Sequence, residues 1–592
     1  MNALRGNGLF RRFDEVHQFL NFFFVGPDAQ QCHSLSFPDG LLIPADNDQH
    51  REQTLLVKFY ASELRLRGKA PIIQPHVRGR NVLCWNGEIF EGMEISEEQN
   101  DGVKLFDVLC SAVETADICH IFSRIEGPYA FVFYHESSER LYFGRDPLGR
   151  RSLLLHAPTQ DMPYLLLSSV SGGANPAYDF LELPTEYIYS FDLKSWEPSL
   201  DIHASFHQNL VANSRVPALS DVVLKSFAVP AKINITLPSG DIPQVKNLAN
   251  IPQHLKHAVD DLIYQLDRSV MLQVSNIPYH SERNKARVAV LFSGGIDSTI
   301  LTFLANKYIP LEEPIDLLNV AFENPRKIRV QQQGNIGGVS KRHKKRTHSK
   351  ERNMEHNEKR VISYLVPDRV TGMQEVEELR RLCPGRTWNF VEINVPFEEC
   401  QAARPLVESL MHPSRTVMDL SLALALFFAS RGVGQIRKNF ESDPVPYTSE
   451  AKVLINGLGS DELLGGYGRH RSVYSSGGWE AVINELQEEI DRIPTRNLGR
   501  DDRVISCHGK ETRHPFLSLS LVSFLASLPV HFKMDPRLEP GIGDKMLLRL
   551  AARKIGLTEA SSRKKRAMQF GSHSARMDGE RRGDMGLDEA IS

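Results

Sequence analysis

The feature that most constrains the fold is an apolar run at residues 288–292, which passes through Ser-Gly-Gly into a helix start, Ile-Asp-Ser-Thr. Such a run, bounded by a glycine turn, is typical of a buried strand in a sheet that helices cover. In the flanking sequence, strand-type and helix-type runs alternate in the same way. We expect helices at 258–274, 298–307 and 417–430, and strands at 287–292, 316–322, 388–395 and 452–455. This half of the chain therefore predicts an α/β domain with a parallel sheet.

The glycine turn after this strand has the chemistry of an anion site. Backbone N–H groups and the positive end of the following helix dipole converge there. Gly294 and Gly295 let the main chain approach a pyrophosphate without a Cβ clash, and Ser293 and Ser298 can donate hydroxyl hydrogen bonds. Asp297 is placed to coordinate Mg²⁺. Because no G-x-x-x-x-G-K-S/T string occurs in the chain, a kinase-like P-loop is excluded.

A second glycine turn, Asn-Gly-Leu-Gly-Ser-Asp-Glu, follows the expected strand at 452–455. Its carboxylates, Asp461 and Glu462, would meet the first loop at a neighbouring strand end, which suits a clamp for a metal and a pyrophosphate. The alternative is an acidic pair that merely favours a helix start. Further along, Lys545 and Arg549 are four residues apart on one predicted helix face, which alone indicates a solvated basic face.

The N-terminal third consists of short β-type runs instead. We expect strands at 81–85, 129–134, 140–144, 152–156, 164–169 and 187–191, and one helix at about 102–116. The chain then divides into a sheet-rich domain at 1–200, a linker at 201–257, an α/β domain at 258–571 and a flexible polar tail at 572–592.

Composition excludes several classes of protein. With 41% hydrophobic residues, 24% charged residues and a net charge of -3, the chain is neither disordered throughout nor a general polyanion binder. It shows no membrane span and no secretory signal, and its seven scattered cysteines indicate reduced thiols and a cytoplasmic setting. Residues 326–360 hold twelve Lys or Arg against three Glu. This stretch indicates a solvated insert or, alternatively, a nuclear-import or nucleic-acid patch.

The three C-terminal segments together resemble the synthetase domain of asparagine synthetases, whose signature runs S-G-G-x-D-S, G-x-G-x-D-E-x-x-x-G-Y and E-K-x-x-x-R. Asp544 stands here for the glutamate of the last motif. Gly-Tyr-Gly-Arg-His-Arg at 466–471 and Lys565-Arg-Ala-Met-Gln-Phe-Gly resemble the asparagine synthetase domain-containing protein 1 family more closely still. The likeness spans residues 53–571 and implies an ATP-pyrophosphatase fold, similar to the adenine nucleotide alpha hydrolases, for the second domain.

This resemblance implies that ATP activates the side-chain carboxylate of aspartate as an acyl-adenylate, and that ammonia from glutamine or from solution displaces AMP to give asparagine. Mg²⁺ is the implied cofactor. The residues implied for ATP binding are Leu291, Ser293, Gly294, Gly295, Asp297, Ser298, Val320 and Gly457. Asp297 and Asp461 would hold the metal, and Lys545 would be the catalytic cation at the α-phosphate.

Two departures from the synthetase pattern concern amide formation. Asparagine synthetases have a glutamate between the glycines of the second loop, where this chain has Leu458, which cannot accept a proton. In Arg513-His-Pro-Phe-Leu-Ser, the synthetase pattern ends in aspartate rather than in Ser518.

The first domain resembles class II glutamine amidotransferases, which have an N-terminal-nucleophile αββα fold. The likeness lies in Trp85-Asn-Gly-Glu-Ile-Phe and Phe143-Gly-Arg-Asp-Pro-Leu-Gly. The Asn-Gly dipeptide alone is not specific for this family, because it is also typical of a β-hairpin turn. The residues that the resemblance implies for the oxyanion hole are Asn86 and Gly87, and those for the amino group of glutamine are Glu88 and Asp101.

The nucleophile of that family is absent from this sequence. Position 2 holds Asn2 instead of cysteine, and the arginine that clamps the substrate carboxylate is replaced by Val25. As written, the chain should not hydrolyse glutamine, either because the domain has become structural or because the start of the sequence is misassigned.

Three functions remain open at this point. The first is an ATP-dependent amide synthetase, supplied by free ammonia or by a glutaminase. The second is a nucleotide-binding pseudoenzyme or scaffold, which Leu458, Asn2 and Val25 favour. The third is a tRNA-modifying adenylase, which the basic insert favours and the lack of a dedicated RNA-binding domain opposes. Nothing in the sequence indicates an oligomeric state or a membrane partner.

Overall fold

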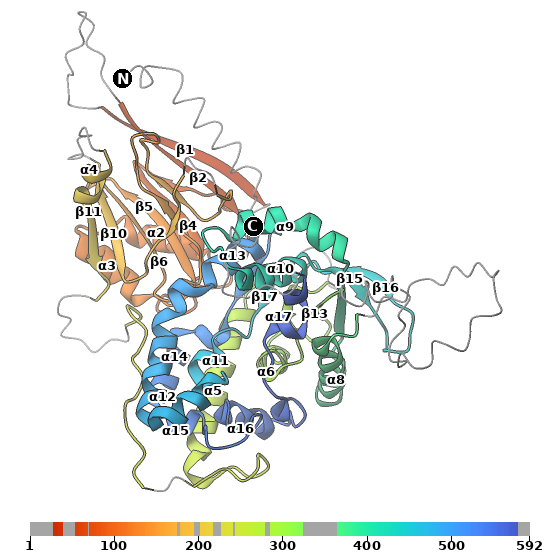
Figure 1. Cartoon of the computed structure of the whole chain (residues 1–592). Helices are drawn as coiled ribbons and strands as arrows, with labels where there is room; N and C mark the ends of the chain where they lie inside the picture. The colour runs from red at the N-terminus through yellow and green to blue at the C-terminus, as the bar shows by residue number, and fades with distance from the viewer. Residues whose placement is uncertain are drawn as a thin grey trace, which may run out of the picture.

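Figure 1 shows a computed structural model of the chain, in which a six-stranded sheet lies at the centre of the N-terminal half and a seven-stranded sheet at the centre of the C-terminal half. The structure describes residues 28–38, 54–68, 70–174, 178–193, 202–216, 226–240, 243–278, 285–323 and 364–577. The basic stretch at 326–360, Asn2 and Val25 lie outside these residues.

The C-terminal sheet has seven strands in the order β16-β15-β14-β13-β12-β17-β18. These are β12 (Val288–Leu291), β13 (Ile315–Phe322), β14 (Trp388–Val395), β15 (Val433–Ile436), β16 (Val445–Thr448), β17 (Val453–Ile455) and β18 (Glu511–Arg513). The five strands from β14 to β18 in this order are parallel, whereas β15 and β16 form an antiparallel edge. The predicted parallel sheet is confirmed.

Helices cover both faces of this sheet, because its strands carry apolar residues on both sides. Val288 and Val290 of β12 belong to one hydrophobic core and Ala289 to another. The first core includes residues of α5 (Lys256–Val274), α6 (Ile296–Ala305), α8 (Pro367–Leu382), α12 (Arg469–Arg496), α14 (Leu519–Ser527) and α16 (Met546–Lys554). The second includes residues of α9 (Phe397–Met411), α10 (Val417–Arg431) and α13 (Leu498–Ser506).

The strand order changes direction at β12. The chain passes from β12 through α6 to β13 on one side, whereas β17 pairs with β12 on the other side. The connections after β12 and β17 therefore lead to opposite sides of the sheet, to β13 and β18, while the loops at the carboxyl ends of these two adjacent strands lie beside each other. In open sheets of this kind, ligands bind outside the strand ends at such a switch point.

The N-terminal sheet is antiparallel, with the order β11-β10-β6-β5-β4-β3. Its strands are β3 (His76–Arg78), β4 (Asn81–Gly87), β5 (Tyr129–His135), β6 (Arg140–Arg145), β10 (Tyr187–Asp192) and β11 (Leu210–Ser214). One face packs on α2 (Asp101–Leu109) and α3 (Thr115–Arg124), and the other packs on β1 (Ala29–Pro38), β2 (Thr54–Glu63) and residues around β7 (Leu154–His156). These are three layers of the expected αββα arrangement.

Three boundaries differ from the sequence-based expectation. The helix expected at 102–116 is two helices, because Glu114 and Asp117 form a capping box that starts α3. The expected linker, 201–257, is not a free spacer. Its β11 completes the N-terminal sheet, and Phe227 and Val245 lie in the first C-terminal core. Residues 572–577, expected in the tail, belong to the folded domain, since Met577 is buried in the second core.

Buried arginines join the two halves. Arg150, on the N-terminal side, donates hydrogen bonds to Glu126 at 2.8 Å and to the carbonyl of Leu517 at 2.9 Å. Its neighbour Arg151 pairs with Asp502 at 2.9 Å across the same boundary. Both arginine side chains are 2% exposed, so the two halves share a buried, charge-paired interface. Among the described residues, no helix is both long and apolar enough to cross a membrane.

Candidate active site

The turn after β12 packs tightly against α8. Gly294 has a φ of +75°, and a Cβ at this position would lie 2.5 Å from the backbone nitrogen of Gly372. Only glycine accommodates both the left-handed backbone and this approach. Gly295 is the N-cap of α6 and has no side chain to cap that helix, so the first N–H groups of α6 remain directed at the turn. The hydroxyl of Ser298 donates to the carbonyl of Gly295 at 3.1 Å, and that of Ser293 accepts from its N–H at 3.3 Å.

Three of the sequence-predicted residues meet at one nitrogen atom. Nζ of Lys545 lies 2.8 and 2.7 Å from the two carboxylate oxygens of Asp297 and 2.7 Å from Oδ1 of Asp461. It also donates to the hydroxyl of Ser460 at 2.9 Å. Asp297 is in the first turn of α6, and Asp461 is in α11 (Ser460–Leu464), which follows β17. The loops of two neighbouring strands and a distant lysine thus form one site.

Lys545 occupies a different backbone position from the one that the sequence predicts. It does not share a solvated helix face with Arg549: it precedes α16, has a φ of +51°, and both side chains are 1% exposed. Arg549 instead donates to the carbonyls of Ser561 and Arg563 at 2.9 and 2.7 Å. The basic pair is therefore buried, with the lysine directed at the two aspartates.

Lys565 also belongs to this cluster, although it is not among the site residues predicted from the sequence. Its ammonium group pairs with Oδ2 of Asp461 and lies 6.0 Å from the ring centre of Tyr467. Burial alone would raise the pKa of Asp461, but the charges of Lys545 and Lys565 hold that pKa well below its usual range. Asp461 is therefore ionised at neutral pH. Lys565 is the first residue of the motif Lys565-Arg-Ala-Met-Gln-Phe-Gly, and this motif is the sequence signal that points to it.

Glu462 does not join Asp461 in the cluster. Its carboxylate accepts a hydrogen bond from the hydroxyl of Tyr467 and lies 3.6 Å from a guanidinium nitrogen of Arg496. Only one carboxylate of the expected pair therefore faces Asp297. Leu458 packs against the first hydrophobic core, and its N–H donates to the side-chain oxygen of Asn456.

The residues expected near the nucleoside lie along the same edge of the sheet. Leu291 ends β12, Val320 lies in the last half of β13, and Gly457 follows β17 by two residues. A Cβ on Gly457 would lie 2.9 Å from Cβ of Asp297, so this glycine lets the two loops touch. The eight predicted ATP-binding residues thus gather around the switch point at β12.

The donor set at this point suits Mg²⁺. Among the described residues, no group of three or more His, Cys, Asp and Glu side chains forms a ready-made metal cage. Mg²⁺ does not need one, because it commonly binds through one or two carboxylates together with phosphate oxygens and water. Asp297 and Asp461 both lie within 2.8 Å of Nζ of Lys545, so oxygens of both can reach one cation.

In the N-terminal half, the residues expected to bind glutamine line a cavity of about 850 Å³. They are Asn86, Gly87, Glu88 and Asp101. The cavity is also lined by Arg151, Lys510 and Glu511, so it reaches the boundary with the C-terminal half.

Arginines already pair with the carboxylate of Glu88. Arg67 donates to one of its oxygens, and Arg513 at the end of β18 lies 3.3 Å from the other. Asp101 accepts the N–H groups of Ile89 and Gly102, each at 2.9 Å. Burial, together with the negative charge of Glu88, raises the pKa of Asp101 to about 7. Neither Arg67 nor Arg513 is among the residues that the sequence predicts for this site.

Each half of the chain matches the model of a known protein family. A family model described as Glutamine amidotransferase domain matches residues 61–170, and one described as Asparagine synthase matches residues 474–585. Human asparagine synthetase domain-containing protein 1 is 38% identical over 573 residues, which cover 88% of each chain. The asparagine synthetase domain-containing protein of Saccharomyces cerevisiae is 32% identical, covering 89% of this chain and 86% of its own. That of Drosophila melanogaster is 30% identical, covering 88% and 90%.

The likeness to solved structures is weak by comparison. A glutamine phosphoribosylpyrophosphate amidotransferase from B. subtilis shares 11% identity, with a TM-score of 0.22 over 51% of this chain and 62% of its own. This likeness carries no inference about the fold. The sequence relatives, in contrast, extend over nearly the whole chain. The protein therefore belongs to the asparagine synthetase domain-containing protein 1 family, with a glutamine amidotransferase domain followed by an asparagine synthase domain.

Proposed function

We propose that the C-terminal domain has the ATP-pyrophosphatase arrangement and transfers AMP from Mg–ATP to a carboxylate, with aspartate as the substrate that the resemblance to asparagine synthetases implies. The observation that carries this proposal is the meeting of Asp297, Asp461 and Lys545 beside the amino end of α6. Two carboxylates suited to a divalent cation, a buried ammonium group and a helix amino terminus all face one region. This combination suits the departure of a pyrophosphate.

The chemistry assigns a distinct part to each group. An oxygen of the substrate carboxylate attacks the α-phosphorus, the bond from phosphorus to the bridging oxygen breaks, and pyrophosphate leaves with the electron pair. Lys545 stabilises negative charge that develops on the phosphate oxygens. Ser293, Gly294, Gly295 and Ser298 would bind the phosphates, and Leu291, Val320 and Gly457 would contact the nucleoside. Mg²⁺, held by Asp297 and Asp461, would neutralise the leaving pyrophosphate.

Amide formation requires a further base. Ammonia attacks the acyl carbon, AMP leaves, and a surplus proton of the nitrogen must pass to an acceptor. Leu458 cannot accept it, and Glu462 is engaged by Tyr467 and Arg496. We therefore propose asparagine synthesis as the overall reaction of this chain, with adenylation as the half-reaction that its residues support best.

For the first domain, we propose amino-acid binding at Asn86, Gly87, Glu88 and Asp101. Because position 2 holds Asn2 and not the cysteine of class II amidotransferases, we propose free ammonia as the nitrogen source. All seven cysteines are unpaired, which supports a reducing compartment such as the cytoplasm.

The test is pyrophosphate release from Mg–ATP by the full chain, with and without L-aspartate. We expect release that depends on aspartate, and Lys545→Ala to lower its rate by about 10² or more, because a preorganised charge at the phosphate is lost. Lys554→Ala is the matched control, because Lys554 pairs with Asp260 on the exposed surface. Absence of aspartate-dependent release at saturating Mg²⁺ would refute the proposal.

A second candidate, a nucleotide-binding scaffold, is favoured by one observation. Glu88, which would hold the amino group of a substrate, is paired with Arg67 and Arg513. A scaffold should be stabilised by Mg–ATP against thermal unfolding without releasing pyrophosphate. Any asparagine formed in an ammonia-supplied reaction, and lost in Lys545→Ala, excludes it.

A further inference from the structure

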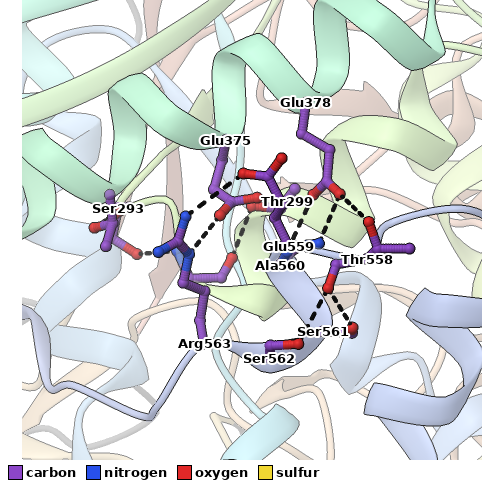
Figure 2. A network of polar contacts seen from close by, with 12 residues as sticks. Ser293, Thr299, Glu375, Glu378, Thr558, Glu559, Ala560, Ser561, Ser562 and Arg563 are labelled. Atoms are coloured by element: carbon purple, nitrogen blue, oxygen red, sulfur yellow. Dashed lines mark hydrogen bonds and ion pairs between the residues drawn. The ribbon is translucent and has the colours of Figure 1, made fainter. Parts of the chain in front are cut away.

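The segment between α16 and α17 (Met568–Gly571) is bound to α8 by several hydrogen bonds to two buried glutamates. Glu378 accepts hydrogen bonds from the N–H groups of Glu559 at 2.7 Å and Ala560 at 3.0 Å, and from the hydroxyl of Thr558 at 3.3 Å. One turn earlier on α8, Glu375 accepts from Nε of Arg563 at 2.6 Å. Figure 2 shows the two glutamates side by side above this segment, with Arg563 between Glu375 and Ser293.

These glutamates are costly to bury. Glu375 is 0% and Glu378 1% exposed, and a buried carboxylate destabilises the fold unless its partners are well placed. From the other side, Arg549 donates to the carbonyls of Ser561 and Arg563, which places the same segment between two helices. The segment 558–563, which we call the latch, is therefore fixed by side chains from both α8 and α16.

Two residues beyond the latch, the chain presents Lys565 to the aspartate cluster. Its ammonium group reaches Oδ2 of Asp461, while Lys545 occupies Oδ1. The side chain of Lys565 is 31% exposed, whereas that of Lys545 is 1% exposed. Lys565 thus closes the open side of a site whose buried side is closed by Lys545.

We propose that Lys565 is a second phosphate-binding cation of the nucleotide site, held in place by the latch on Glu375 and Glu378. The inference rests on the proposed function of this site. A divalent cation at Asp297 and Asp461 competes with both ammonium groups for the same oxygens. The ammonium groups are then drawn to phosphate oxygens, which are the strongest acceptors that a nucleotide brings. Because Lys565 pairs with Asp461, which is proposed to hold the metal of the leaving pyrophosphate, it binds the pyrophosphate part of ATP rather than the nucleoside.

The test is equilibrium binding of Mg–pyrophosphate and, separately, of AMP to the full chain. We expect Lys565→Met to weaken Mg–pyrophosphate binding ~10- to 100-fold, the loss of one or two charge-assisted hydrogen bonds, with AMP binding unchanged. Lys565→Arg should restore most of the affinity. Lys564→Met is the matched control: it removes the same charge one residue away and should bind both ligands as the wild type does.

The latch is tested by Glu378→Gln, which keeps the size of the side chain and removes its charge. We expect it to weaken Mg–pyrophosphate binding 3-fold or more, again without an effect on AMP. The inference is overturned if Lys565→Met binds Mg–pyrophosphate as the wild type does, or if it loses AMP and pyrophosphate binding equally. If the wild type fails to bind Mg–ATP, the proposed function itself fails. If the wild type binds Mg–ATP and Lys565→Met shows no selective loss, only the role of Lys565 fails.

Discussion

Replacing Gly466 by alanine would place a methyl carbon 1.9 Å from Oδ1 of Asp461 and 2.4 Å from Cε of Lys545. Non-bonded carbon atoms sit about 3.5 Å or more apart, so Asp461 and Lys545 would each have to move by about 1 Å or more. Both belong to the polar cluster around Asp297, so the substitution separates the groups proposed to bind the metal and the α-phosphate.

A displacement of ~1 Å in a catalytic site can cost about 10²-fold in rate, which corresponds to ~2.7 kcal/mol of transition-state stabilisation. We expect a loss of this size in aspartate-dependent pyrophosphate release by Gly466→Ala. The stabilisation by Mg–ATP in a thermal unfolding assay should shrink in parallel. The matched control is Gly468→Ala, because a Cβ at Gly468 meets no atom within 4 Å. It should retain the wild-type rate to within about twofold, since an unobstructed methyl group leaves the site in place.

The result that would refute this reasoning is a Gly466→Ala variant with wild-type pyrophosphate release and a wild-type response to Mg–ATP. Asp461 and Lys545 would then not act in one site. A variant that unfolds without ligand at a much lower temperature than Gly468→Ala would also contradict the argument, because the expected damage is confined to the polar cluster.

Three further predictions concern the interface, the pH dependence and the metal. Arg151→Met leaves Asp502 buried without its ion-pair partner, so the free energy of unfolding should fall by about 3–5 kcal/mol in urea titrations. Arg492→Met removes an exposed ion pair and should change that free energy by no more than ~0.5 kcal/mol. Equal effects of the two substitutions would contradict the buried interface. Asp101 binds its proton more tightly in the folded state, because its pKa is raised to about 7 from about 3.9 in unfolded chains. The protonated Asp101 side chain therefore contributes to stability below about pH 4, and this contribution is lost as the pH rises to about 7. Between about pH 5 and pH 8, the free energy of unfolding of the wild type should fall relative to that of Asp101→Asn. A difference between the two that does not change with pH would contradict this. ATP at about 100 times its dissociation constant should stabilise the fold by ~2.7 kcal/mol, and EDTA should abolish most of this gain if Asp297 and Asp461 hold the metal.

The fold of the C-terminal domain could be predicted because its signals are local. The apolar strand at 288–291 and the glycine turn after it require a sheet with helices on both faces, and the structure has that sheet. The same locality explains why Asp297 and Asp461 could be placed together: both directly follow neighbouring parallel strands, whose carboxyl ends share an edge.

The remaining parts depend on contacts between distant residues. Lys565 pairs with Asp461 across 104 positions in the sequence, and Arg513 meets Glu88 across the domain boundary. No periodicity indicates such pairs. Lys545 was expected on a helix face because its spacing to Arg549 fits one, but the residue adopts a left-handed backbone before the helix begins. Positive φ is rare for lysine, and a sequence pattern gives no sign of it.

The cavity in the N-terminal half could be predicted from the sequence only in part. Its four expected residues do line one cavity, yet the arginines that occupy the carboxylate of Glu88 come from 21 residues away and from β18. Whether a site is free for a ligand or already paired depends on such partners. The sequence could therefore locate the cavity but not describe its electrostatics.

The most direct test of the central claim uses Mg–ATP, L-aspartate labelled with ¹⁸O in its side-chain carboxylate, and hydroxylamine. Hydroxylamine serves as the nucleophile because it does not depend on a base at position 458. If the carboxylate attacks the α-phosphorus, displacement at the acyl carbon leaves one labelled oxygen on AMP. We predict ¹⁸O in AMP, unlabelled pyrophosphate, and loss of both products in Lys545→Ala. Label in inorganic phosphate, or AMP without label, would contradict adenylation by this site.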